Sequence, residues 1–586
     1  MVRKLNIVLL LIINLIYGQI PNYWSTYFEK SNFLETPRYS ETIEYFNKLD
    51  KHSEFGKIIS IGKSAEGRDI YIFIASKDKA FTSRKAKLTG KPIIFIQNGI
   101  HAGEIDGKDA SMLLLREILV TKEKFHFLDD MILVIMPIFN VDGHERFSPY
   151  NRINQNGPEE MGWRTNAQNL NLNRDYMKAD SPEMKVWLKF FNEWLPQVFI
   201  DCHVTNGADY QYELTYSSEK HNNVHPILGH WIKNEFIPFL ELEMSKAGYK
   251  IAPYMWFRGD EVEKGIIDGI TPPRFSTGYV ALHNRITLLI ETHMLKDYKT
   301  RVFATKEMIE AVLKKVSQER KNIIDLIEKV EKLSLEELVY EKKYLPIRFQ
   351  TSQESEKFTF FGYKYNKVPS IISGKDKIVH TNEKIEMEIP LYNKHITIDS
   401  VNAPPAYLIP PAYSNLVDIL KLHGIKSEKI RTRKKFIVEK YKFSENTTWQ
   451  RRPFEGRIQV NTTYEIFQDT VIIPTGYYYI NPYQKNIKVL MHLLEPKSSD
   501  SFVAWGFFNS IFERKEYYED YVMEKIAEEM YNSNEKLRIE FENKIKADSL
   551  FANNPNLRLE FFYRNSPYFD KEWLVYPVMR VVKILE

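Results

Sequence analysis

The chain has a single cysteine, Cys202, among its 586 residues. An internal disulfide framework is therefore excluded, and packing, hydrogen bonds or a metal must stabilise the fold. Glycine and proline are also scarce, at 24 and 27 residues, whereas 43% of the residues are hydrophobic. This composition excludes a collagen-like or largely disordered chain. A chain of this length has room for up to about four domains.

Neither sign of charge is in excess. The 81 Lys and Arg residues nearly balance the 77 Asp and Glu residues, which gives a formal net charge of +4. Such a chain lacks the large positive field that engages phosphate groups, so a dedicated nucleic-acid binder is excluded. No apolar run reaches the about 20 residues that a membrane-spanning helix needs.

The first residues have the pattern of a targeting signal. Arg3 and Lys4 precede an apolar stretch over residues 5–17, and the small residue Gly18 follows. This order is typical of a secretory signal peptide, and we expect cleavage after Gly18. An uncleaved anchor or a buried N-terminal helix remains the alternative. Cleavage would lower the net charge by two and leave an exported protein, secreted or periplasmic, without stable membrane insertion.

Short, continuously apolar runs alternate with helical patterns up to about residue 330. Runs of this kind are typical of strands covered on both faces, and they lie at residues 70–76, 92–100, 131–140, 196–201 and 286–291. Helical spacing covers residues 106–119, 181–195, 225–248 and 306–333. Ser181 followed by Pro182 is a typical helix start. The alternation predicts an α/β sheet with helices on both faces.

The pattern of predicted secondary structure changes after about residue 340. Short β-type runs separated by turn residues extend to about residue 495, and a helical pattern returns over 503–546. After a signal peptide at 1–18, we therefore expect an α/β domain over 19–335 and a β-rich accessory domain over 340–500. A helical C-terminal segment, 501–586, is expected to pack on the preceding domains. The later half of the chain shows no motif that predicts chemistry.

Four histidines have an acidic residue three positions later, a spacing that can bring two ligands to one metal ion. The pairs are His101/Glu104, His126/Asp129, His380/Glu383 and His492/Glu495. Only His101 and Glu104 lie between a predicted buried strand and a helix, where open α/β sheets form ligand sites. The other three pairs lie in a charged connection, before a polar turn and inside an apolar run. They are interpreted as surface or core residues.

His203 supplies a third candidate ligand, because it directly follows another predicted buried strand. Two histidines, a glutamate and an open position form a catalytic zinc set. Its neighbour Cys202 points to the opposite face of the strand and is expected to be a buried, small apolar group. Glu291 ends a third strand and is a candidate base. Its alternative is an ordinary carboxylate paired with a nearby base such as Arg285.

Five motifs follow one another in an order that resembles a known family. They are NGIHAGE (98–104), FNVDGHERF (139–147), GWRTN (162–166) with NLNLNRDY (169–176), DCH (201–203) and IETH (290–293). Together with SIGKSAEGRDI (60–70), they resemble the zinc carboxypeptidases of the carboxypeptidase A type, peptidase family M14. The resemblance covers roughly residues 35–300 and implies a mixed, mostly parallel, twisted sheet.

The resemblance also implies roles for individual residues. It implies that one zinc ion is bound by His101, Glu104 and His203. Glu291 resembles the general base that activates the zinc-bound water, and Arg164 resembles the arginine that polarises the scissile carbonyl. The pair that grips the terminal carboxylate of a peptide substrate corresponds to Asn173 and Arg174. The expected function is an exported zinc metallocarboxypeptidase that hydrolyses C-terminal residues of peptides with zinc-activated water.

The sequence departs from the family pattern at two positions. Gly103 stands where the family often has a subsite arginine, and Asn171 stands where an aspartate often supports the first histidine. The family's mobile tyrosine is not marked by a motif, and Tyr279 is a candidate for it. Two other functions therefore stay open. One is the same chemistry on cell-wall peptides or amide-linked side chains; the other is an inactive relative that binds peptide or glycan.

Overall fold

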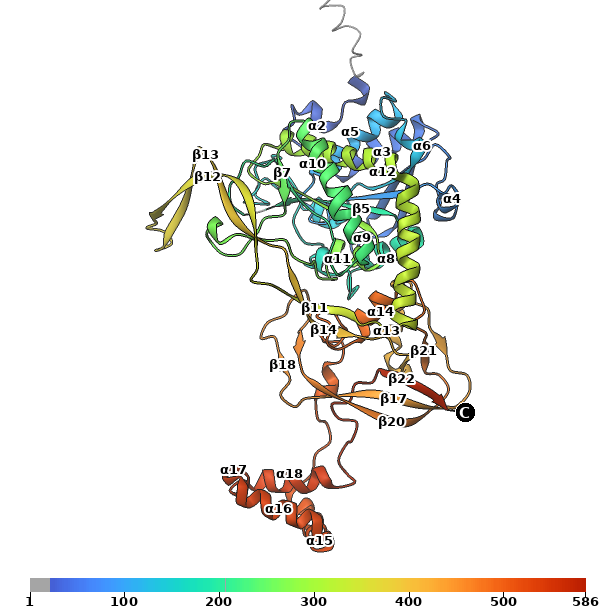
Figure 1. Ribbon diagram of the computed structural model, residues 1–586, viewed down its shortest axis with the longest axis vertical. Coiled ribbons are helices and arrows are strands. Elements are labelled where there is room, and N and C mark those ends of the chain that lie inside the picture. The colour runs from blue at the N-terminus through green and yellow to red at the C-terminus, as the bar shows by residue number, and fades with distance from the viewer. Residues whose placement is uncertain (1–21, 206, 586) are drawn as a thin grey trace, which may run out of the picture. The chain divides into compact units, whose positions relative to one another are not determined.

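The structure is a computed structural model that describes residues 22–205 and 207–585 (Figure 1). The predicted signal peptide, residues 1–18, lies outside these residues. The chain divides into two compact units. The first extends to Pro404 and includes Tyr413–Glu428 and Ile480–Ser501, and the second comprises Pro405–Ala412, Lys429–Tyr479 and the residues from Phe502 onward. No helix in the described part of the chain has the length and apolar character to cross a membrane.

An eight-stranded sheet forms the centre of the first unit, in the order β1-β2-β4-β3-β5-β10-β6-β7. Its strands are β1 (Gly56–Lys63), β2 (Asp69–Ala75), β3 (Ile93–Asn98), β4 (Ile132–Met136), β5 (Val198–Thr205), β6 (Leu214–Ser217), β7 (Ile251–Pro253) and β10 (Ile286–His293). The pairs β3–β4, β3–β5, β5–β10 and β6–β7 are parallel. The other neighbours are antiparallel. The predicted mixed, mostly parallel sheet is confirmed.

Helices cover both faces of this sheet, as predicted. The helices are α3 (Tyr39–His52), α5 (Asp106–Leu119) and α12 (Tyr298–Leu335) on one face, and α8 (Pro182–Trp194) and α11 (Ser276–Leu282) on the other. Because side chains alternate along a strand, Ile94 and Ile96 enter the large core shared with α5 and α12. Phe95 instead contacts Phe190 of α8, with ring centroids 5.0 Å apart.

Two helices differ from their predicted bounds. The segment predicted as one helix over 225–248 contains α9 (Pro226–Trp231), a π-helical turn (Ile232–Phe236) and α10 (Ile237–Lys246). Pro238 lacks a backbone N–H group and so cannot continue the regular ladder from α9, which explains the interruption. Helix α12 begins ahead of the predicted start, because the Asp297 side chain caps it by accepting from the Thr300 amide.

The first unit also contains a long hairpin from the later part of the sequence (Figure 1). Strands β12 (Glu356–Pro369) and β13 (Asp376–Tyr392) form a second sheet with β9 (Ile266–Ile267) and β8 (Trp256–Phe257). Phe360 of this hairpin packs in one hydrophobic cluster with Tyr210 and Tyr212. The remaining elements of the unit include β11 (Leu345–Thr351), β14 (His395–Val401), α13 (Ser414–Leu422) and α14 (Ile487–Leu494).

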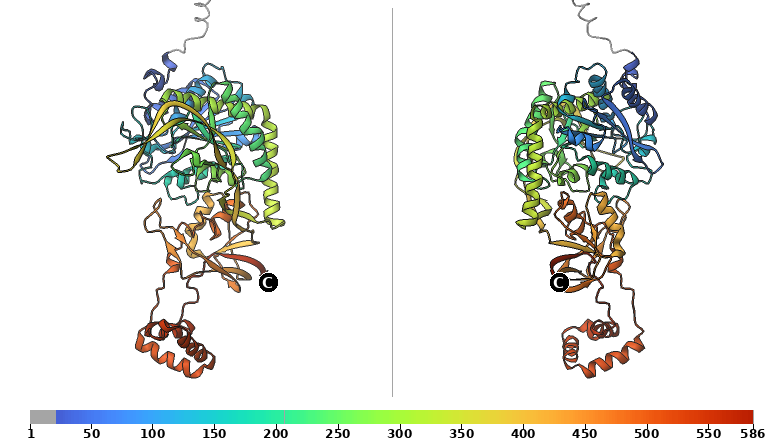
Figure 2. Two further views of the ribbon diagram at one scale, coloured as in Figure 1. Left: turned by 60° about the vertical axis from the view of Figure 1, so that its left-hand side comes forward. Right: turned by 90° about the vertical axis from the view of Figure 1, so that its right-hand side faces the viewer.

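The second unit is a β-sheet with a group of helices inserted before its last strand. The main strands are β15 (Ala406–Ile409), β17 (Lys434–Phe443), β20 (Tyr464–Ile473) and β22 (Met579–Leu585). The helices, red in Figure 2, are α15 (Asp520–Ser533), α16 (Glu535–Ala547), α17 (Ser549–Ala552) and α18 (Pro555–Asn565). They pack around their own apolar cluster, which includes Met523, Phe541 and Phe562. The helical pattern at the end of the sequence is therefore followed by a strand that returns to the sheet.

Candidate functional site

The structure brings the three candidate metal ligands together at the ends of two neighbouring strands. His101 and Glu104 follow β3, and His203 lies in β5. Oε2 of Glu104 lies 3.0 Å from Nδ1 of His203 and 3.2 Å from Nδ1 of His101. All three side chains are buried, and their ligand atoms lie within 4.8 Å of one another. Within the residues that the structure describes, no other three His, Cys, Asp or Glu side chains converge in this way.

This donor set fits zinc. Two imidazole nitrogens and one carboxylate oxygen are the ligands that a catalytic zinc site uses, with a further position left open. The other ring nitrogen of each histidine is held from behind: Nε2 of His203 lies 2.9 Å from Oδ2 of Asp201, and Nε2 of His101 lies 3.1 Å from Oδ1 of Asn171. These contacts orient both Nδ1 atoms toward the same point, as metal-binding histidines require.

The protonation of the ligand set follows from burial and from neighbouring charges. Burial lowers the pKa of His101 to about 3, so its imidazole is neutral. Burial disfavours the charged form of Glu104, but the Arg152 guanidinium and the hydrogen bonds with His101 and His203 outweigh it and hold the pKa of this carboxyl well below its usual range. Glu104 is thus a carboxylate and His101 a free base, the forms in which both side chains bind a metal ion.

The other three histidines are surface or core residues, as expected. His126 is exposed to solvent. His380 lies in β13, and its ring centroid is 6.0 Å from that of Tyr365. His492 is buried in α14, with Nδ1 3.0 Å from Oγ of Ser498. None of the three joins a group that could hold a metal within the described residues.

All seven candidate residues predicted from the sequence line one cavity of about 680 Å³. They are His101, Glu104, Arg164, Asn173, Arg174, His203 and Glu291. The carboxyl ends of the parallel strands β5 and β10 lie side by side, and Glu291 is the register partner of His203. Ligand sites form at this edge of open α/β sheets.

Glu291 is buried and has no ordinary ion-pair role with Arg285. Nη2 of Arg285 lies 2.5 Å from Oε1 of Glu331, so the alternative that Arg285 neutralises Glu291 is wrong. Burial raises the pKa of Glu291 to about 8; the Glu104 carboxylate adds to this rise, and His203 opposes it. A bound cation would favour the carboxylate form, because a metal charge dominates its surroundings. The arrangement places a proton acceptor at the edge of the metal-ligand cluster.

Arg164, Asn173 and Arg174 line the same cavity from the loop region after β4. Nη1 of Arg164 lies 3.1 Å from Oε1 of Glu104. The Arg174 guanidinium lies over the Phe275 ring, 3.9 Å from its centroid, and donates to the carbonyl of Asn173 at 2.7 Å. A guanidinium beside an amide side chain can hold a carboxylate through charge-assisted hydrogen bonds. The apolar wall near them includes Phe275, Ile270 and Leu289.

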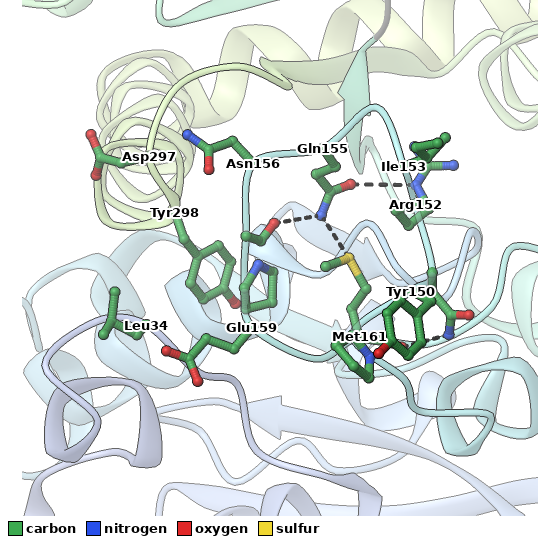
Figure 3. Close-up of a pocket in the computed structure, with 14 residues that line it drawn as sticks. Leu34, Tyr150, Arg152, Ile153, Gln155, Asn156, Glu159, Met161, Asp297 and Tyr298 are labelled. Carbon is green, nitrogen blue, oxygen red and sulfur yellow. Dashed lines mark hydrogen bonds between the residues drawn. The ribbon is translucent and has the colours of Figure 1, made fainter.

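Arg152 is a cavity residue that the sequence did not reveal. Its Nη2 atom lies 2.7 Å from Oε1 of Glu104. The side chain comes from an irregular loop, and with Gln155 it also lines a second cavity of about 720 Å³ (Figure 3). A Cβ atom at Gly103 would lie 2.6 Å from Cγ of Arg152, so Gly103 leaves the space that Arg152 fills. An irregular loop has no periodicity from which this contact is predictable.

Tyr279 does not line the cavity. Its ring is fully buried, and its hydroxyl lies 2.9 Å from Nδ1 of His423. The tyrosine that lines the cavity is Tyr254, whose pKa is raised by burial and by the Glu291 charge. Cys202 behaves as predicted: it is buried in the apolar core on the opposite face from His203, and burial raises the pKa of its thiol.

Two of the early sequence motifs support the fold and lie outside the cavity. Asp142, in FNVDGHERF, accepts hydrogen bonds from Ser64 Oγ at 2.8 Å, from the Glu66 amide at 2.9 Å and from Arg68 Nη1 at 2.7 Å. Because the three donors belong to SIGKSAEGRDI, these hydrogen bonds join the two motifs in the fold. Their spacing in the sequence therefore reflects a structural contact.

Comparison with known proteins relates most residues of this site to a family. Residues 42–235 match the family model of Peptidase_M14, described as zinc carboxypeptidase. Carboxypeptidase 2 of Trichophyton rubrum is 22% identical over 493 residues, covering 80% of this chain and 84% of the relative. That alignment extends beyond the part of the chain that the family model matches. Carboxypeptidase A6 of Mus musculus is 28% identical over 146 residues, covering 20% of this chain and 31% of the relative.

Solved structures were also compared. A metallo-carboxypeptidase from Burkholderia cenocepacia is 15% identical, with a TM-score of 0.36, and the match covers 48% of this chain and 69% of that one. The carboxypeptidase A from Helicoverpa armigera is 16% identical, also with a TM-score of 0.36, and covers 48% of this chain and 74% of that one. The family match places residues 42–235 among the zinc carboxypeptidases of peptidase family M14, and the alignment with carboxypeptidase 2 extends the similarity over 80% of the chain.

Proposed function

We propose that the protein is an exported zinc metallocarboxypeptidase that releases C-terminal residues from peptides. The observation that carries this proposal is the single cavity that holds the three ligand side chains, Glu291, Arg164 and the pair Asn173 and Arg174. Each group has a chemical task in amide hydrolysis next to a free carboxylate. Residues 19–335 are proposed as the catalytic domain.

His101, Glu104 and His203 are the residues that would hold one zinc ion. Their donor atoms suit it, and so do the neutral form of His101 and the ionised form of Glu104. When bound, zinc supplies a Lewis acid that polarises an oxygen atom and lowers the pKa of water. The side chains around the ligands supply the remaining steps.

Asn173 and Arg174 would bind the terminal carboxylate of the substrate. The Arg174 guanidinium is held in place by the Asn173 carbonyl and by the face of Phe275, so little conformational freedom is lost on binding. A fixed carboxylate determines which amide bond lies beside the ligand cluster. This geometry restricts cleavage to the last residue and excludes substrates whose C-terminus is blocked.

Glu291 and Arg164 would act on the reacting atoms. The Glu291 carboxylate accepts a proton from the attacking water and returns it to the nitrogen of the leaving amine. The Arg164 guanidinium, whose Nη1 already donates to a buried carboxylate in the cavity, donates to the oxygen that becomes negative when the carbonyl is attacked. Burial of Glu291 limits the screening of its own charge by bulk water.

The proposal is tested with one peptide in two forms. The mature protein is incubated with a peptide that has a free C-terminus and with the same peptide amidated at its C-terminus, and released amino acids are quantified. Release of the last residue from the free peptide alone supports the proposal. Equal cleavage of both forms, or cleavage at internal bonds, would contradict it. Glu291→Gln serves as the matched inactive control.

A further inference from the structure

Asp201 is a buried carboxylate directly behind a proposed metal ligand. It lies two residues before His203 in β5, so both side chains point to the same face of the sheet. Oδ2 of Asp201 accepts a hydrogen bond from Nε2 of His203 at 2.9 Å, and Oδ1 accepts one from Nε2 of Gln97 at 2.9 Å. Since Nδ1 of His203 faces the ligand cluster, Nε2 must carry the proton. The carboxylate is fully buried.

Ser276 connects this carboxylate to the other end of the cavity. Its hydroxyl donates to Oδ2 of Asp201, and its backbone amide donates to Oδ1 of Asn173 at 3.0 Å. A continuous series of hydrogen bonds therefore runs from Asn173 through Ser276 and Asp201 to His203. All four residues are less than 9% exposed, so water does not compete for these bonds.

The two ligand histidines are supported differently. His101 has the neutral amide of Asn171 behind it, at 3.1 Å, whereas His203 has the Asp201 carboxylate. A carboxylate fixes the tautomer of a ligand histidine and raises its basicity more than an amide does. The negative charge that strengthens the ligand set therefore lies behind His203 in this chain.

We propose that Asp201 and Ser276 are positioning residues that hold His203 for zinc and couple it to Asn173, the residue assigned to the substrate carboxylate. This inference rests on the proposed function. A substrate carboxylate that binds the side-chain amide of Asn173 also fixes its Oδ1 atom, which accepts a hydrogen bond from the backbone amide of Ser276. The Ser276 hydroxyl in turn fixes the Asp201 carboxylate. Because coupling between two binding events is reciprocal, zinc and the substrate carboxylate each favour binding of the other.

Zinc affinity is the first test, because it does not depend on turnover. The mature protein and its variants compete for zinc with a chromophoric chelator. We expect Asp201→Asn to lower the affinity about 10–100-fold and Ser276→Ala to lower it by a smaller factor. Ser218→Ala is the matched control: this buried serine forms no side-chain hydrogen bond among the described residues, and its loss should leave the affinity unchanged.

The second test measures the coupling. At saturating zinc, kcat/KM for a peptide with a free C-terminus is compared among Ser276→Ala, Asn173→Ala and the double variant. Ser276→Ala keeps the backbone amide that holds Asn173, so it breaks only the bond to Asp201. We expect the two effects to be non-additive, with Ser276→Ala costing less in the Asn173→Ala background than alone.

The outcomes separate this inference from the proposed function. A wild-type protein that binds no zinc would overturn both. A wild-type protein that binds zinc and releases C-terminal residues, with unchanged zinc affinity in Asp201→Asn or in Ser276→Ala, would overturn the inference alone. Strict additivity in the double variant would overturn the coupling. Ser276→Ala removes a single oxygen atom and keeps the test decisive if Asp201→Asn does not fold.

Discussion

The guanidinium of Arg152 lies 2.7 Å from Oε1 of Glu104, in space that the absent side chain of Gly103 leaves open. Arg164 reaches the same oxygen at 3.1 Å. Two cations therefore face one carboxylate of the ligand cluster, and both line the cavity that Asn173 and Arg174 share. Gly103 thus leaves the space in which the Arg152 side chain reaches Glu104.

Replacing Arg152, which holds the proposed metal ligand Glu104, should lower activity. A charge-assisted hydrogen bond contributes about 1.5–3 kcal/mol, so Arg152→Ala is expected to lower kcat/KM roughly 10–100-fold. Steady-state kinetics on a peptide with a free C-terminus measures this loss. The control is Arg146→Ala: Arg146 is exposed, stacks on Trp163 and does not line the cavity. Equal kinetics in the two variants would show that the contact of Arg152 with Glu104 does not affect activity.

Replacing Glu291 should separate metal binding from turnover. Glu291→Gln keeps the size of the side chain and removes its ability to accept a proton, so kcat should fall about 10²–10⁴-fold. The three ligand side chains are untouched, and zinc content should stay at one ion per chain. Metal analysis and initial rates on the same preparation check both statements. Full activity in Glu291→Gln would rule out its role as the base.

Replacing Arg174 should act mainly on substrate affinity. Arg174→Ala removes a charged partner of the substrate carboxylate, and KM should rise roughly 10–100-fold from a loss of about 1.5–3 kcal/mol. Arg174→Lys keeps the charge and loses the paired geometry, so it should recover only part of the affinity. An unchanged KM in Arg174→Ala would place the carboxylate elsewhere in the cavity.

Lys488 should make stability depend on pH. Its ammonium group is buried in α14 and donates to the Asn223 carbonyl at 3.1 Å and to Oδ1 of Asn284 at 2.8 Å. Burial lowers the pKa of Lys488 from 10.5 to about 7, and the Glu337 charge opposes this shift. Between these two pH values the unfolded chain holds a proton that the folded chain has released, so stability rises with pH across this window.

Lys488→Met removes that dependence. The variant should therefore gain most stability relative to the wild type near pH 7, and its advantage should shrink as the pH approaches 10. Denaturant unfolding at pH 7, 8 and 9 measures the difference in free energy of unfolding. The control is Lys485→Met, because Lys485 is exposed and pairs with Glu331 at the surface. Parallel pH profiles for Lys488→Met and the wild type would refute the buried charge.

Much of the sheet and the ligand set was predictable from sequence for a physical reason. A strand buried on both faces must be continuously apolar, so a histidine or glutamate near the carboxyl end of such a strand stands out, as His101 and His203 do. Parallel strands end at the same edge, which brings residues that are 102 positions apart within hydrogen-bonding distance.

The supporting residues were not predictable in this way. Asp201 belongs to the DCH motif, but its position behind His203 was not predicted, and its contact with Ser276 joins positions 75 residues apart. Arg152 lies in a loop without periodicity. The hairpin β12–β13 was assigned to a separate domain by composition, yet it packs with Tyr210 and Tyr212 near the cavity strands β8 and β9.

Metal removal and restoration test the central claim most directly. The mature protein is stripped with a chelator, dialysed and assayed for release of the last residue from a peptide with a free C-terminus, before and after one equivalent of zinc is added. The account predicts that release stops in the stripped protein and returns with that single equivalent. Undiminished release from protein shown by metal analysis to contain no zinc would contradict it.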